Sequence, residues 1–171
     1  MPEGRRSLIS RVLRPVVLAG IVYACWLGMM LVHEFGHVVH AWLSGAKVTH
    51  VAVPLFGFSR TELAGNPRPL FVAWGGPIWG CVLPLLMLAA ARFVPSRPRS
   101  VAVFFAGLCL IANGAYLTVG SFLLAGDAGD LIRYGAPQWA LLAFGAVTMP
   151  AGLYLWHLLG PRFGIRQKPE P

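Results

Sequence analysis

Acidic residues are scarce in this sequence, where only 6 of 171 residues are Asp or Glu. Charged residues of both signs make up 12% of the chain and hydrophobic residues 57%. Soluble domains carry about 25% charged and about 45–50% apolar residues, so an ordinary soluble domain and a disordered chain are both excluded. The composition predicts an integral membrane protein. The six acidic residues are Glu3, Glu34, Glu62, Asp127, Asp130 and Glu170.

The sequence also lacks paired cysteine motifs and a continuous basic face. Cys25, Cys81 and Cys109 each lie in an apolar run without Cys-x-x-Cys spacing. They read as small core residues, which excludes a disulfide framework and a zinc knuckle. The net charge is +8, but the basic residues cluster between the apolar runs. That clustering indicates a positive-inside signal and attraction to anionic lipid headgroups, with no nucleic-acid partner.

The apolar residues gather in four segments, each long enough for a membrane helix of about 20 residues. The segments run from about Pro15 to Leu43, from about Leu70 to Val94, from Val101 to Ala125, and from about Trp139 to Leu159. Pro15 suits a first helical position, and Pro150 is expected to break the fourth segment. The first segment is a retained helix, since it is long for a signal peptide and lacks a small-residue cleavage site.

A short loop segment separates the first two apolar segments. Lys47 to Val53 alternates weakly, and Pro54 to Phe58 has the composition of a turn, which predicts a β-hairpin. The fold class is therefore all-α integral membrane, with about four transmembrane helices and a short β-hairpin-like loop after the first. We expect a basic N-terminal segment at 1–14, a single membrane-embedded domain at 15–160 and a basic tail at 161–171. The basic residues place both termini in the cytoplasm of a multi-pass protein, expected in the cell membrane.

The first apolar segment contains the motif His33-Glu34-Phe35-Gly36-His37. On a helix, the two histidines lie one turn apart on the same face and can reach one ion. Two neutral imidazoles can hold zinc while leaving positions open, and zinc lowers the pKa of water toward about 7. Glu34 is then placed to take the proton. Charged residues inside a membrane cost about 2.5–3.5 kcal/mol each, so three ionisable residues in five predict a metal site.

A catalytic zinc held by two histidines needs a third protein ligand. The first and third apolar segments run in the same direction, so the end of the third lies near the membrane depth of His37. Asp127 and Asp130 follow that end directly, and either can supply the ligand. Solvated acids that cap the next helix are the alternative interpretation. The more distant candidate ligands are Glu62, His50 and His157.

These motifs resemble the site-2 protease family of intramembrane zinc metalloproteases. The stretch at 33–37 matches the family pattern H-E-x-G-H, and Trp74–Gly80 is similar to the Ala-Gly-Pro segment of its second core helix. Gly126–Leu131 is similar to the family's Leu-Asp-Gly segment, with Ala128 in place of its usual glycine. The resemblance covers roughly residues 20 to 135. The family's Asn-x-x-Pro is absent before the aspartate, and Gly80 stands where the family often has Asn.

The resemblance implies roles for individual residues of this chain. His33, His37 and Asp127 would bind a zinc ion, and Glu34 would be the catalytic residue. Family sites commonly lie toward the cytoplasm, whereas the basic residues place this site on the opposite side. Asp130 and Asn113 would support the ligands or position substrate. The spacing of His40, seven residues after His33 on roughly the same helical face, fits either a residue that supports the ligands or an interfacial histidine.

Two functions fit these observations. The first is a zinc-dependent intramembrane endopeptidase that hydrolyses peptide bonds in or near transmembrane segments of membrane proteins, in contact with the lipid bilayer. The alternative is a non-proteolytic metal-binding membrane protein, either an inactive relative or an assembly factor. The missing Asn-x-x-Pro and the small size favour this alternative. The substrate, any regulatory partner and the oligomeric state stay open.

Overall fold

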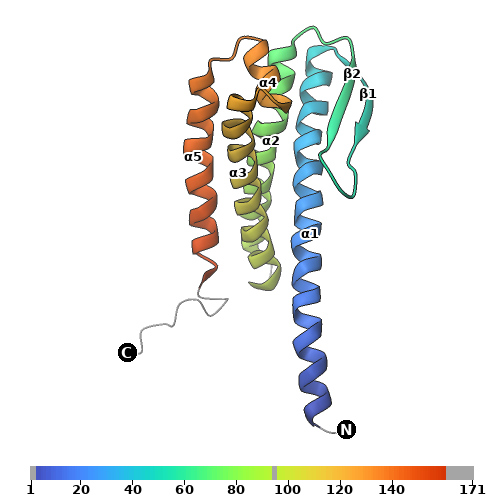
Figure 1. The fold of residues 1–171 in the computed structure, drawn as a ribbon, viewed down its shortest axis with the longest axis vertical. Helices are drawn as coiled ribbons and strands as arrows, with labels where there is room; N and C mark the ends of the chain where they lie inside the picture. The colour runs from blue at the N-terminus through green and yellow to red at the C-terminus, as the bar shows by residue number, and fades with distance from the viewer. Residues whose placement is uncertain (1–2, 94–95, 161–171) are drawn as a thin grey trace.

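Four long helices form the body of the protein in this computed structural model, which describes residues 3–93 and 96–160 (Figure 1). They are α1 (Glu3–Ser44), α2 (Pro69–Ala90), α3 (Ser96–Leu123) and α5 (Gln138–His157). All four are long and apolar enough to cross a membrane. They run alternately up and down, so α1 begins on the side where α5 ends. The predicted multi-pass membrane fold is confirmed, and the predicted tail at 161–171 lies outside the described residues.

The predicted helix start at Pro15 and the predicted break at Pro150 are both wrong. α1 begins at Glu3, so Pro15 lies inside the helix instead of opening it, and the predicted boundary between 14 and 15 falls within α1. α5 likewise continues through Pro150. A proline removes one backbone hydrogen bond, and packing against neighbouring helices compensates for this in membrane proteins. α2 continues past Pro77 and Pro84 in the same way and ends in a 3-10 turn at Ala91–Phe93.

The predicted hairpin is present after α1. It consists of β1 (Lys47–Ala52) and β2 (Arg60–Ala64), which pair antiparallel. The hairpin folds back along α1 (Figure 1). Its tip is tied to that helix by the Tyr23 hydroxyl, which donates a hydrogen bond of 2.9 Å to the Leu55 carbonyl. This path lays β2 beside the part of α1 that carries the His-Glu motif.

A short helix between α3 and α5 was not predicted. This helix, α4 (Gly126–Arg133), lies across one end of the bundle (Figure 1). The turn into it has left-handed backbone at Leu124 and Gly126, with φ of 51° and 54°. Glycine is required at 126, because a Cβ there would also collide with the Tyr116 hydroxyl. Ala128 and Leu131 of α4 are completely buried and hold the helix against the bundle.

Glycines set the closest contacts between the helices. Gly36 of α1 faces Gly75 of α2, and a Cβ on either would lie within 3.0 Å of the other's backbone. Gly114 of α3 faces Gly145 of α5, where a Cβ on Gly145 would lie 2.9 Å from the Gly114 carbonyl oxygen and a Cβ on Gly114 would lie 3.3 Å from Gly145 Cα. Small residues let helix backbones approach closely in membranes, where van der Waals packing drives association. Both helix pairs, α1/α2 and α3/α5, are therefore packed through facing glycines.

Candidate metal centre

The His-Glu motif lies on the buried side of α1. Glu34 is 3% exposed and His37 is 7% exposed, although both belong to the candidate membrane span Leu13–Ser44. His37 is seven residues from Ser44, the end of the helix, which corresponds to about 10 Å along the axis. The motif therefore lies inside the span, near the end that carries α4 and away from the start of α1.

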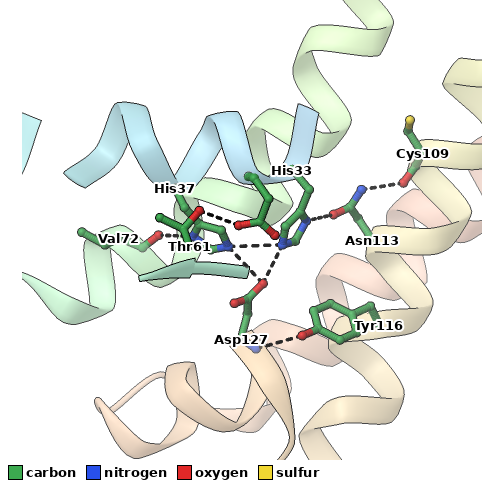
Figure 2. Close-up of polar contacts among 9 residues, drawn as sticks. His33, His37, Thr61, Val72, Cys109, Asn113, Tyr116 and Asp127 are labelled. Atoms are coloured by element: carbon green, nitrogen blue, oxygen red, sulfur yellow. Dashed lines mark hydrogen bonds and ion pairs between the residues drawn. The ribbon is translucent and has the colours of Figure 1, made fainter. Parts of the chain in front are cut away.

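Asp127 of α4 meets the two histidines (Figure 2). Its Oδ2 atom is 2.7 Å from His33 Nε2 and 3.2 Å from His37 Nε2. The two Nε2 atoms are 3.2 Å apart. Three potential ligand atoms from two separate elements thus converge on one point, and together they form a group that can hold a metal ion.

The outer nitrogen of each imidazole has a partner that fixes the ring. His37 Nδ1–H donates to the Val72 carbonyl at 2.9 Å. His33 Nδ1–H donates to Asn113 Oδ1 at 2.7 Å, while Asn113 Nδ2 donates to the Cys109 carbonyl at 2.8 Å. Because the Nδ1 atoms carry the protons, each neutral imidazole presents a lone pair at Nε2. Such outer partners orient histidine ligands in metal sites.

The three converging atoms fit a zinc ion. Zinc–nitrogen bonds of about 2.0 Å in a tetrahedral arrangement place neighbouring ligand atoms about 3.3 Å apart. The observed separations are 2.7, 3.2 and 3.2 Å. Two Nε2 lone pairs and a carboxylate oxygen can all donate an electron pair to a cation, so one shared ion would bind all three. Two histidines and one carboxylate are also a donor set of catalytic zinc sites.

Asp127 is held in its ionised form. Burial alone would raise the pKa of its carboxyl, but the close contacts of its carboxylate with the His33 and His37 imidazoles outweigh burial and lower the pKa well below its ordinary value. The backbone N–H of Asp127 donates to the Tyr116 hydroxyl at 3.2 Å, which anchors the start of α4. The carboxylate therefore brings a fixed negative charge to the histidines.

Space for an ion and a substrate lies next to these groups. A Cβ on Gly76 would lie within 3.0 Å of Nε2 of both His33 and His37, so the glycine leaves room beside the ligand atoms. A cavity of about 550 Å³ opens onto the site. Its lining includes His33, Glu34, Thr61, Asn113, Tyr116 and Asp127.

A sequence model of the Peptidase M50B-like family matches residues 8–126, which is most of the chain. The chain belongs to this family. The Peptidase M50B-like family is the site-2 protease family, so the resemblance drawn from the motifs is confirmed. The match includes the motif at 33–37 and the segment Trp74–Gly80, and it ends one residue before Asp127. No curated protein and no solved structure matches the chain.

The structure separates the two aspartates between which the sequence alone could not decide. Asp127 lies against the histidines, whereas Asp130 accepts a hydrogen bond of 2.8 Å from the exposed Arg133. Asp130 still lines the cavity. Glu62 of β2 is exposed and pairs with Arg60, and His50 is exposed on β1. Neither of these hairpin residues is brought to the histidines.

Two other residues named from the sequence have different surroundings. Asn113 is buried and bound to His33, as a supporting residue would be. His40 donates from Nδ1 to the Phe71 carbonyl at 2.7 Å and stacks on the Phe71 ring, so it contacts α2 rather than the three ligand atoms. In this M50B-like chain, α2 thus accepts hydrogen bonds from two successive histidines of α1.

Two residues of the site were missed by sequence reasoning. Thr61 of β2 donates a hydrogen bond of 2.5 Å to Glu34 Oε2, and Tyr116 of α3 accepts one from Asp127. Strand alternation offered a signal for Thr61, because it lies on the same face of β2 as Leu63. Tyr116 stands within an apolar segment and carried no comparable signal.

Proposed function

We propose that this M50B-like protein is a zinc-dependent intramembrane endopeptidase. The observation that carries the proposal is the convergence of His33, His37 and Asp127 beside a cavity that Glu34 also lines. The family membership supports a peptidase acting in a membrane. His33, His37 and Asp127 would hold the zinc ion, and Glu34 would be the catalytic base.

Zinc in such a site supplies Lewis acidity, which polarises a carbonyl and lowers the pKa of water. Glu34 accepts a proton from the attacking water, whose oxygen bonds to the carbonyl carbon of the scissile peptide. When the carbon–nitrogen bond breaks, Glu34 returns the proton to the leaving amine. Asn113 and the Val72 carbonyl keep the two imidazoles oriented throughout, and Tyr116 keeps Asp127 in place.

The proposed substrate is a transmembrane segment of another membrane protein, or the stretch next to it. The part of the cavity lined by α1 before His33 is apolar and consists of Trp26, Met29 and Met30. A helical substrate must unwind locally to expose a peptide bond. β2 lines the same cavity and pairs with β1 along one edge, so its other edge is available to hold the unwound segment by strand addition. We further propose a cell-membrane location with both termini in the cytoplasm.

The test is the Glu34→Gln variant, purified and loaded with zinc. The probe is a pool of single-span peptides with varied central sequences, labelled at both ends and analysed by mass spectrometry. We expect the variant to bind as much zinc as the wild type, because the three ligands are intact. Cleavage should fall by at least about 100-fold, the usual contribution of a general base.

The matched control is Glu62→Gln, which makes the same change at an exposed residue paired with Arg60. It should cleave like the wild type. Cleavage by Glu34→Gln at the wild-type rate would contradict the proposed mechanism. A wild-type protein that binds zinc and cleaves none of the peptides would instead support the non-proteolytic alternative.

A further inference from the structure

The carboxylate of Glu34, the proposed catalytic base, has a hydrogen-bond partner on the hairpin. The Thr61 hydroxyl donates a hydrogen bond of 2.5 Å to Glu34 Oε2, across 27 positions of sequence. Within the described part of the chain, Thr61 is the one hydrogen-bond partner of Glu34. The second carboxylate oxygen, Oε1, is therefore left available, and Glu34 and Thr61 both line the cavity.

Thr61 carries a hydroxyl on the inward face of β2, where an apolar side chain is expected. Alternate residues of β2 are partly buried, and these are Thr61 and Leu63. Leu63 packs on a cluster formed by Ala41, Ala46 and Val72, as an inward-facing strand residue is expected to do. Thr61 is the polar member of this inward face. Valine has the same shape and the same preference for strands, so packing alone does not require a hydroxyl there.

We propose that Thr61 is a positioning residue for Glu34, an inference that rests on the proposed function. A glutamate side chain has three rotatable bonds, and fixing them costs conformational entropy at the moment of reaction. The hydrogen bond to Oε2 holds the carboxylate in one orientation before substrate arrives. Oε1 is then the oxygen that takes the proton from water. Small displacements of a catalytic group, on the order of 1 Å, can lower a rate by about 100-fold.

This role predicts a specific kinetic pattern for substitutions at 61. Thr61→Val keeps the shape and removes the donor, so kcat should fall by about 10–100-fold while KM stays unchanged. Thr61→Ser keeps the hydroxyl, so it should retain most of the wild-type kcat. Zinc content should equal that of the wild type in both variants. The substrate is the peptide of the pool that the wild type cleaves fastest.

Thr49→Val is the matched control. Thr49 lies on the other strand of the hairpin, is exposed, and donates to the Glu62 carbonyl at 3.0 Å. The same substitution there removes a hydroxyl of the hairpin without touching Glu34, so kcat and KM should both stay at wild-type values. A purely structural role of hairpin hydroxyls would lower the activity of both variants.

A second readout does not depend on activity. The Thr61–Glu34 contact is measured by thermal unfolding of the wild type, Thr61→Val, Glu34→Ala and the double variant. Loss of the hydrogen bond should lower Tm by about 2–4 °C when Thr61 is changed in the wild type. The same change should have no effect in the Glu34→Ala background, because the acceptor is already gone.

The outcomes separate this inference from the proposed function. Thr61→Val with wild-type or increased kcat would overturn the positioning role while the peptidase stands, and an increase would mean that Thr61 restrains Glu34 instead. Equal Tm shifts in both backgrounds would also overturn it. A zinc-loaded wild type that cleaves no peptide would contradict both proposals together.

Discussion

The two helix pairs α1/α2 and α3/α5 are packed alike and carry very different residues. Each pair meets through facing glycines, Gly36 with Gly75 in the first and Gly114 with Gly145 in the second. In the first pair, another glycine, Gly76, lies against the two histidines instead of against a helix backbone. In α1/α2, a glycine therefore leaves space beside two imidazoles. In α3/α5, the facing glycines bring the two helix backbones close together.

α3 belongs to both regions. Its Gly114 faces α5, whereas Asn113 and Tyr116 face the candidate metal centre, where they contact His33 and Asp127. In the described part of the chain, the cavity is lined by residues that all precede α5. The comparison thus predicts that changes in α1/α2 affect metal binding, and that changes in α3/α5 affect stability.

The largest effect is expected from Gly76→Ala. The added Cβ would lie within 3.0 Å of Nε2 of both histidines, so it would occupy the space next to the ligand atoms. Zinc affinity should fall by more than about 100-fold, the upper range seen when only the surroundings of a metal ligand are changed. Competition of the purified protein with a zinc-binding dye measures this affinity.

Gly20→Ala is the control for that substitution. Gly20 lies in α1 with open space where its Cβ would be, so the affinity should not change. Wild-type zinc affinity in Gly76→Ala would show that the ion does not bind in the space beside the imidazoles. It would contradict the claim that the α1/α2 pair provides the room for the metal ion.

A smaller effect of a different kind is expected from Gly145→Ala. The new Cβ would collide with the Thr118 hydroxyl and lie 2.9 Å from the Gly114 carbonyl oxygen, which belongs to the α3 backbone and cannot rotate away. Overpacking of this kind costs about 1–3 kcal/mol of folding free energy. Thermal unfolding should show a lower Tm, while zinc bound per folded molecule stays at the wild-type value. A loss of zinc without a loss of Tm would contradict the separation of the two regions.

Much of the fold could be predicted from the sequence because membrane helices and their order follow from apolar length alone. The motif at 33–37 predicted that His33 and His37 lie side by side, since residues four apart on a helix share a face. The direction of the segments also placed Asp127 and Asp130 near the depth of His37. These inferences use local spacing and chain direction, and neither requires knowledge of packing.

The remaining features depend on contacts between distant segments. α4 follows a left-handed turn at Leu124 and Gly126 and has only 8 residues, which is shorter than the window of about 11–18 residues over which helical periodicity is recognised. The choice between Asp127 and Asp130 depends on which face of α4 meets α1, and the motif spacing does not contain that information. Thr61 reaches Glu34 only because the hairpin folds back along α1.

The choice of third ligand is the most direct test of the central claim, that His33, His37 and Asp127 together hold a zinc ion. The measurement is the zinc content of Asp127→Asn and Asp130→Asn, each purified beside the wild type and analysed by elemental mass spectrometry. We predict that Asp127→Asn loses its zinc, because its carboxylate is the atom group within 3.2 Å of both imidazoles. Asp130→Asn should keep full zinc content, since its exposed pair with Arg133 lies apart from the ligands. Full zinc in Asp127→Asn, or loss of zinc in Asp130→Asn alone, would contradict the account.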